Sequence, residues 1–236
     1  MAISDAPNPA SRTLRVLSRL LGYPGPELRA HLSELRTALH AEAALPERRL
    51  AELDDFIGAL ARQDPLDAQA DYVQLFDSGR RTALHLFEHV HGDSRERGPA
   101  MIDLARTYEQ AGLYLAAGEM PDHLPVVLEF ASTQPAAEAI GLLGENAHLV
   151  NAVFAALRSR HSGYASAMGA LLDLAGVSAS AVHIADEDPP DLSWDEPAAF
   201  SGCGAGRPAR PGTPQPLHFS REVRPDRSSA ARGDLP

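Results

Sequence analysis

Three histidines lie close together in the stretch LHLFEHVHGD, at positions 85, 89 and 91. Histidine is a common ligand of zinc, and residues four apart share one face of a helix, so His85 and His89 suggest a metal site. His91 lies about 240° around such a helix from His85, so the three converge only if the helix ends near Val90. Glu88 does not directly follow the first histidine, as the glutamate does in the H-E-x-x-H zinc motif. The spacing favours surface or helix-end histidines, and a helical His-dependent metalloenzyme stays as the alternative function.

Other catalytic or cofactor-binding patterns are weaker. The glycines of SGCGAG, at positions 202, 204 and 206, follow no predicted strand and precede no GK[ST], so they do not indicate a phosphate-binding loop. Cys203 is the single cysteine, which excludes an internal disulfide and a thiolate zinc site. No G-x-S-x-G nucleophile elbow is present. We therefore expect no catalytic residues, no metal and no cofactor.

The charge of the chain restricts its partners. The 236 residues have a formal net charge of −11. Between Asp71 and Glu129 the sequence contains ten acidic residues and only five arginines. This balance disfavours non-specific binding to nucleic acid or to an anionic membrane, and a basic or amphipathic peptide is a more natural partner. Charge alone also fits a solvated acidic face. The N-terminus has no signal-peptide pattern and no run approaches the roughly 18 apolar residues of a membrane span, so we expect a cytoplasmic protein without direct membrane insertion.

Helical spacing of apolar residues organises most of the chain. The first three helices bury leucines and one isoleucine at positions 14, 17 and 21, then 28, 32, 35 and 39, then 50, 53, 57 and 60. Further helices are predicted over residues 67–76, 82–90, 99–111, 135–143, 146–160 and 163–175. Met101, Leu104, Tyr108 and Ala111 form the predicted buried stripe of one of them, and Ile140 belongs to a later one. Asp122 is predicted to cap the N-terminus of the helix that contains Leu124, Val127, Leu128 and Ala131.

These patterns predict an all-α protein: one helical domain over residues 11–180 and a disordered Pro/Gly-rich tail over residues 186–236. No stretch shows the alternation of a strand. Nine of the 19 prolines lie in the tail, where aliphatic residues are too few to offset the entropy of ordering. Trp194, Phe200, Leu217 and Phe219 are exceptions, and such residues can act as short docking elements on the domain or on a partner.

The central stretch carries a recognisable pattern. YVQLFD, LHLFEHVHGDSRERGPAMIDL and PDHLPVVLEF follow one another between Asp71 and Phe130. In order and spacing they resemble the NarJ family, the molybdenum-cofactor assembly chaperones of respiratory nitrate reductase, within the wider group of twin-arginine-pathway molybdoenzyme chaperones. The resemblance implies a single helical-bundle domain. It also implies a non-enzymatic function: binding the apo catalytic subunit through its N-terminal segment and holding it for cofactor insertion before membrane attachment. Molybdenum-cofactor delivery proteins are further partners that the resemblance suggests.

The resemblance also suggests where a client peptide binds. In the wider group the D-H pair of a PDHLP-like motif is tied to signal-peptide binding, and this pair corresponds to Asp122 and His123. An amphipathic client helix would lie in a groove between chaperone helices, with acidic residues at the rim. The candidate residues come from three predicted elements and are Leu84, Phe87, Glu88, His89, Met101, Tyr108, Asp122, His123 and Leu124.

Structural roles stay open for several residues of this stretch. Asp122 can act as a helix cap, worth about 1 kcal/mol, and His123 as a partly buried residue at a helix start. The arginines at positions 80, 81, 95 and 97 are interpreted as a network with Asp77, Asp93 and Glu96 that pins the loop between two helices.

Overall fold

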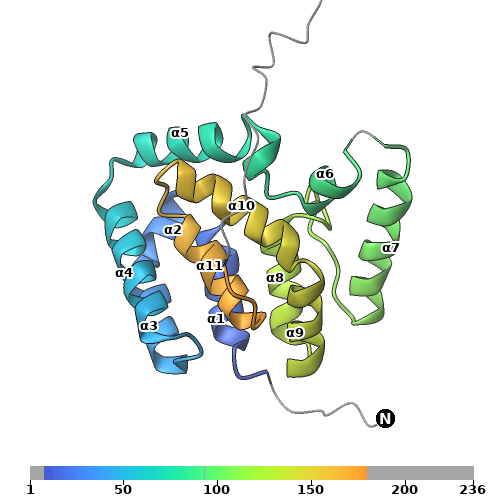
Figure 1. Cartoon of the computed structure of the whole chain (residues 1–236), viewed down its shortest axis with the longest axis horizontal. Coiled ribbons are helices and arrows are strands. Elements are labelled where there is room, and N and C mark those ends of the chain that lie inside the picture. The colour runs from blue at the N-terminus through green and yellow to red at the C-terminus, as the bar shows by residue number, and fades with distance from the viewer. Residues whose placement is uncertain (1–7, 93, 180–236) are drawn as a thin grey trace, which may run out of the picture. The chain divides into compact units, whose positions relative to one another are not determined.

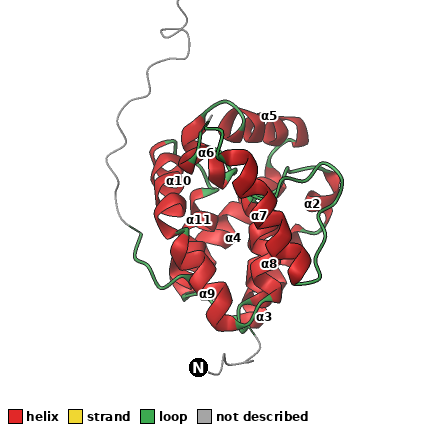
Figure 2. Ribbon diagram, turned by 90° about the vertical axis from the view of Figure 1, so that its right-hand side faces the viewer, coloured by secondary structure: helices red, strands yellow, loops and turns green. Residues whose placement is uncertain are grey.

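The fold is all-α, as predicted. The computed structural model describes residues 8–92 and 94–179. The helices in these ranges are α1 (Ser11–Leu20), α2 (Pro26–Ala30), α3 (Leu32–Glu42), α4 (Glu47–Arg62), α5 (Pro65–Phe76), η1 (Arg80–Thr82), α6 (Leu86–Val90), α7 (Arg97–Gln110), α8 (Leu124–Thr133), α9 (Ala136–Glu145), α10 (Ala147–Ser159) and α11 (Ala165–Leu174). Figure 2 shows helices and loops only, and the single β contact in these ranges is an isolated bridge. The predicted tail, including Trp194, Phe200, Leu217 and Phe219, lies outside the described residues.

The core forms around α1, which lies in the middle of the bundle (Figure 1). Leu14, Leu17 and Leu20 of this helix are at most 1% exposed, and α1 packs against α3 and α8. Helices α10 and α11 pack against each other and bury Leu157 and Leu171 in the same core. Each such side chain contributes about 2 kcal/mol through burial, so the leucine periodicity of the sequence accounts for the bundle.

Several helices depart from the predicted pattern. Residues 82–90 do not form one helix, because η1 ends at Thr82 and His85 is extended before α6 begins. His85 and His89 therefore do not share a helix face. Ile140 was predicted to be buried, but it is 51% exposed on α9.

Helix α7 lies at the edge of the molecule, outside the bundle (Figure 1). Of its predicted buried stripe only Tyr108 is buried; Met101 and Leu104 are partly exposed and Ala111 is exposed. Its end agrees with prediction: Gly112 has φ +79° and the Leu113 N–H donates to the Tyr108 carbonyl at 2.9 Å. Helix α7 therefore has a defined end but little core contact.

One stretch has the length and composition of a membrane span. It is Ala136–Ser159, which comprises α9 and α10, and this corrects the expectation that no run approaches such a span. Half of its most apolar window is buried inside the domain. Packing in the helical core therefore accounts for its apolar composition.

Candidate functional site

Two segments far apart in the sequence meet just before α6 and α8. The Leu86 N–H donates to the Asp122 carbonyl at 3.0 Å, and the Leu124 N–H donates to the Leu84 carbonyl at 2.8 Å. These bonds form the antiparallel bridge between His85 and His123. The bridge brings together two of the three predicted client-binding elements.

Asp122 lies at the centre of this junction and is fully buried. Its Oδ2 accepts the Phe87 N–H at 3.1 Å, and its Oδ1 accepts a hydrogen bond from His85 Nδ1 at 3.2 Å. Asp122 therefore caps α6 from a distant part of the chain. The prediction that it caps its own helix was wrong, because His123 occupies the N-cap position of α8 and no side chain makes that cap bond.

Burial, hydrogen bonds and nearby charges act together on the pKa of the Asp122 carboxylate. Burial by itself raises its pKa, but the hydrogen bonds from His85 and the Phe87 N–H and the charges of His85 and Arg97 outweigh burial, so the pKa of Asp122 lies below its usual value. Arg97 Nη2 lies 3.8 Å from Asp122 Oδ2 and 3.6 Å from Glu88 Oε1. Asp122 is thus a buried anion with a cationic guanidinium nearby.

The rings of His85 and His123 stack with centroids 4.9 Å apart and an interplanar angle of 25°. The hydrogen bond to Asp122 raises the pKa of His85, although partial burial opposes the rise. Burial, followed by the charge of His85, lowers the pKa of His123. The pKa values of the two imidazoles are therefore shifted in opposite directions.

Two of the four arginines, Arg80 and Arg97, contact Glu88 among the described residues. The predicted network includes Asp93, which lies outside the described residues, and it stays a prediction. Arg97 pairs with Glu88 and Asp122, and Arg80 donates from Nε to the Glu88 carbonyl at 3.0 Å. The turn after α6 favours glycine, because Gly92 has φ +53° and the Arg80 guanidinium fills the space that a Cβ there would take. The arginines thus hold the end of α6 by way of Glu88.

The histidine pattern does not assemble a metal site within the described residues. His85 Nδ1 faces Asp122, and His89 Nε2 donates to the Ala83 carbonyl at 2.9 Å. Among residues 8–92 and 94–179, no group of three or more His, Cys, Asp or Glu side chains has a geometry that could hold a metal ion.

Tyr108 connects α7 to the junction. It is 2% exposed, its hydroxyl donates to the Pro121 carbonyl at 2.8 Å, and its ring lies 4.6 Å from the ring of Phe130 on α8. This contact brings the third predicted element to the other two. The junction, α6, α7 and the loop to α8 thus form one region.

The nine candidate residues fall into two groups. Four are buried and can only position the others: Leu84, Tyr108, Asp122 and Leu124. Five are partly exposed and are available for contact: Phe87, Glu88, His89, Met101 and His123.

The nine residues predicted from the sequence do not include the most exposed apolar side chains of this region. Val90 and Ile102 are each 55% exposed, Tyr114 is 80% exposed and Met120 is 43% exposed. Together with the partly exposed Phe87 and Met101 they are called here the α6–α7 surface. The loop LYLAAGEM, with its many apolar residues, could have indicated the exposure of Tyr114 and Met120. The exposure of Ile102 could not be predicted, because the sequence of a helix with apolar residues on two sides does not show which side is covered.

Comparison with known proteins places this region in a family. Residues 40–168 match the family described as nitrate reductase delta subunit. The chain is 44% identical over 205 residues to the nitrate reductase molybdenum cofactor assembly chaperone NarJ of Escherichia coli (strain K12), covering 81% of this chain and 87% of that protein. It is 39% identical to the probable chaperone NarW of the same strain, over 71% of this chain and 69% of that protein. It is 32% identical to the probable chaperone NarJ of Bacillus subtilis (strain 168), over 68% of this chain and 86% of that protein.

Proposed function

The chain belongs to the nitrate reductase delta subunit family, and from this premise we propose that it is an assembly chaperone for respiratory nitrate reductase. In this function it binds the apo catalytic subunit through that subunit's N-terminal segment. It then holds the subunit for insertion of the molybdenum cofactor before attachment to the membrane.

The observation that carries the proposal is the concentration of exposed apolar side chains on one region. Of the nine large apolar residues that are exposed among the described residues, four lie between positions 90 and 120. A large apolar patch that is exposed in this way marks a surface that another molecule covers, and we propose that these side chains form such a patch. The α6–α7 surface is therefore the proposed client site.

The charge around this surface fits a basic amphipathic peptide. Glu88 is partly exposed beside Phe87, and Glu109 and Glu119 are exposed on α7 and in the loop to α8. A client helix would place its apolar face on Val90, Ile102 and Met101 while its Lys or Arg side chains met these carboxylates. Arg97 already pairs with Glu88, so a client cation would share that carboxylate with Arg97.

Asp122 and His123 contribute in different ways. Asp122 is fully buried, so its proposed role is to position α6 and not to contact the client. His123 is partly exposed and stacks on His85, so it can contact a client side chain directly.

The proposal also covers catalysis, location and further partners. We propose that the chain assists assembly without catalysing a reaction. We place this function in the cytoplasm, where an apo subunit would await its cofactor. The proposal includes contacts with molybdenum-cofactor delivery proteins. The metalloenzyme alternative gains no support from the relatives, which are named as chaperones. Elemental analysis of the purified protein that finds stoichiometric zinc, iron or manganese, lost in His85→Ala or His89→Ala, would favour the alternative.

The direct test is calorimetric titration with a synthetic peptide of the first residues of the catalytic subunit. We expect saturable binding, and Ile102→Ser and Tyr114→Ser should each weaken it about tenfold, since a well-packed interface residue is worth more than about 1 kcal/mol. His123→Ala should weaken binding as well.

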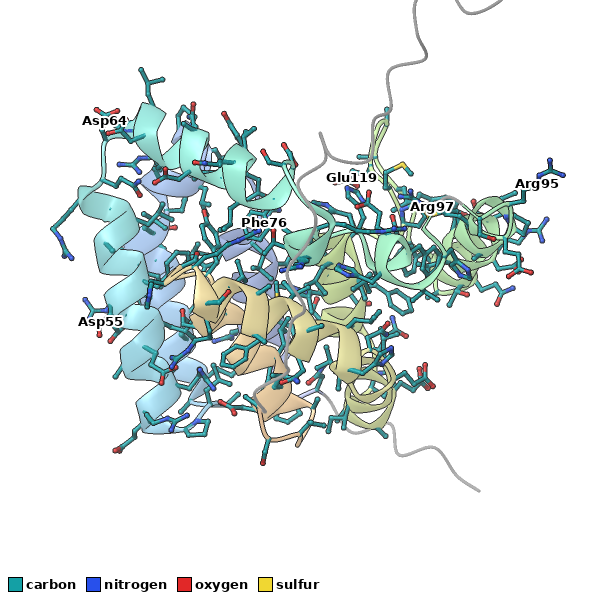
Figure 3. The ribbon with its side chains drawn as sticks, turned by 45° about the horizontal axis from the view of Figure 1, so that its top comes forward. Asp55, Asp64, Phe76, Arg95, Arg97 and Glu119 are labelled. Carbon is teal, nitrogen blue, oxygen red and sulfur yellow. The ribbon has the colours of Figure 1, made fainter. Side chains whose placement is uncertain are left out.

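Matched controls come from α5, which contributes no residue to the α6–α7 surface. Leu66 and Val73 on α5 are 74% and 43% exposed. Asp64, which begins α5, lies on the other side from Arg97 and Glu119 (Figure 3). Leu66→Ser and Val73→Ser should leave the affinity unchanged. Absence of binding to the folded wild-type protein, or equal losses in the control variants, would contradict the proposed site.

A further inference from the structure

A cavity lies between α4, α5 and the turn that joins α10 to α11, residues 160–164 (Figure 1). Its volume is about 610 Å³, which falls in the range of sites that bind small molecules. None of the described residues that line it belongs to the α6–α7 surface. The cavity is therefore separate from the proposed client site, and its own side chains indicate what it can bind.

One wall of the cavity is apolar and contains two aromatic rings. Phe56 and Tyr164 are 6% and 7% exposed, and their ring centroids are 4.7 Å apart. Gly163 lets the turn approach this wall closely, because the Phe56 ring fills the space that a Cβ there would take. Leu60 and Leu75 also line the cavity. A flat ligand can therefore pack its face on a preformed apolar wall.

A carboxylate lies on the α5 side of the cavity. Asp71 Oδ2 accepts a hydrogen bond from Gln63 Nε2 at 2.6 Å, and both side chains line the cavity. A carboxylate has two oxygens and accepts several hydrogen bonds, so Asp71 can also accept N–H groups of a ligand. This side of the cavity therefore suits the donor groups of a ligand.

The hydroxyl of Tyr164 is buried and has no hydrogen-bond partner among the described residues. Burial raises the pKa of this hydroxyl, and the proximity of Tyr72 and Asp71 raises it further, so the group stays protonated. Buried polar groups are almost always paired in native proteins. An unpaired hydroxyl on a residue that lines a cavity is therefore a group that a ligand could pair.

The turn provides N–H donors on the other side of the cavity. Arg160 Nη1 donates to Thr82 Oγ1 at 2.8 Å, which leaves the other N–H groups of the guanidinium for a ligand. His161 has φ +53°, and the Ser162 N–H donates to the Leu157 carbonyl at 3.0 Å, so His161 occupies the helix-ending position where glycine is commonest. Such departures from local preference gather at functional sites.

We propose that this cavity binds a pterin that carries an anionic group, with the donor edge of its ring on Asp71 and its anionic group on Arg160 and His161. The inference rests on the proposed function, since the molybdenum cofactor whose insertion it serves is a pterin with a phosphate group. The ring system of a pterin is flat, and its amino and ring N–H groups donate along one edge, as a carboxylate requires. The pterin is bound as cargo for the client and not as a resident group.

The first test is a fluorescence titration of the full-length chain with 6-carboxypterin, a fluorescent pterin whose carboxylate stands in for the phosphate. We expect saturable binding of one pterin per chain. Naphthalene-2-carboxylate is also flat and anionic but lacks the donor edge, so it should bind at least about tenfold more weakly. No binding of 6-carboxypterin, or an equal Kd for the two compounds, overturns the proposal.

Substitution of Asp71 tests the donor edge. Asp71→Asn should raise the Kd for 6-carboxypterin at least about tenfold, because hydrogen bonds to a charged acceptor are lost. Asp67→Asn is the matched control, since Asp67 is an exposed carboxylate of α5 that does not line the cavity, and it should bind like the wild type. Equal Kd values for the two variants would overturn the assignment of Asp71.

His161→Gly separates binding from folding. Glycine adopts φ +53° without strain, so the midpoint of urea denaturation should not fall. The Kd for 6-carboxypterin should nevertheless rise at least about threefold, because a donor to the anionic group is lost. A variant that binds 6-carboxypterin like the wild type would contradict the placement of the anionic group on the turn.

A steric pair of variants tests whether the pterin enters the cavity. Ala59 and Ala61 are both exposed on α4, but only Ala59 lines the cavity. Ala59→Trp should fill the cavity and raise the Kd for 6-carboxypterin at least about tenfold, whereas Ala61→Trp should leave it unchanged. Losses in both variants, or in neither, would overturn the location.

The client peptide distinguishes this inference from the proposed function. Because the cavity and the α6–α7 surface share no residue, saturating client peptide should change the Kd for 6-carboxypterin by less than about twofold. Displacement of the pterin by the peptide would place the pterin on the α6–α7 surface and overturn the proposal. Binding of the peptide without the pterin would overturn the cavity assignment alone. Binding of the pterin without the peptide would support the cavity and contradict the client site.

Discussion

His85 and His123 stack on each other while only His85 faces the carboxylate of Asp122. A proton on His85 is stabilised by that carboxylate, and the resulting charge, together with burial, opposes a proton on His123. Between the two shifted pKa values the pair therefore carries one proton, located on His85. In that pH interval the pair presents one cation and one neutral ring.

The opposite pKa shifts predict opposite effects on stability. The raised pKa of His85 adds stability that is fully present below about 6.5, the ordinary value, and is lost as pH rises through the folded pKa. The lowered pKa of His123 adds stability that is present above about 6.5 and is lost as pH falls through its folded pKa. Urea denaturation between pH 5.5 and 8 should show His85→Gln flattening the alkaline decline and His123→Gln flattening the acid decline. Unchanged slopes in both variants would contradict these assignments.

Removal of the Asp122 carboxylate should lower the free energy of unfolding more than removal of an exposed carboxylate. Asp122→Ala leaves the Phe87 N–H and His85 Nδ1 without their acceptor, so we expect a loss of about 2 kcal/mol in the free energy of unfolding. Asp122→Asn retains an acceptor for Phe87 and should lose less. Asp103→Ala on α7, where the side chain is 76% exposed, is the control and should change stability by less than about 0.5 kcal/mol. Equal effects of Asp122→Ala and Asp103→Ala in denaturant titrations would refute the capping role.

At the scale of elements, local signals in the sequence were sufficient for most helices. Apolar spacing predicted the core faces, and Gly112 correctly predicted the end of α7, because both depend on neighbours in the chain. The break between η1 and α6 could not be predicted, since it depends on the bridge to residues 122–124 and on a cap from Asp122, 35 residues away. For the site, the sequence indicated the three elements but not that α7 leaves Ile102 exposed, because periodicity does not show how many faces of a helix are covered.

Helix α7 should be the least protected long helix of the domain. Only Tyr108 of its 14 residues is buried, whereas eight of the ten residues of α11 are. Local opening costs little where few apolar contacts are lost, so α7 amides should exchange with deuterium faster than those of α10 and α11. Client peptide should slow exchange in α6 and α7 and leave α5 unchanged. Protection of α7 equal to that of α11 without peptide would show that α7 is held by more than these contacts.

The whole molecule separates the proposed binding region from the core. The leucines of α1, α8, α10 and α11 bury one another in the bundle, while α7 is joined to its neighbours through the buried Tyr108 and the ion pairs of Arg97. Surface substitutions on α7 can therefore change recognition with little change in global stability. This division makes the binding variants interpretable, because a loss of affinity need not reflect unfolding.

The negative charge of the whole molecule should govern how fast a basic client arrives. The net charge of −11, with −5 between residues 71 and 129, attracts a basic peptide from a distance, and salt screens this attraction over about 10 Å at 0.1 M and about 3 Å at 1 M. We expect the association rate, measured by stopped flow, to fall about tenfold from low to high salt. The dissociation rate should change little, because it depends on apolar contacts at short range. A peptide whose Lys and Arg are replaced by Gln is the control and should associate slowly at every salt concentration. An association rate of the basic peptide that does not respond to salt would show that apolar contact alone recruits the client.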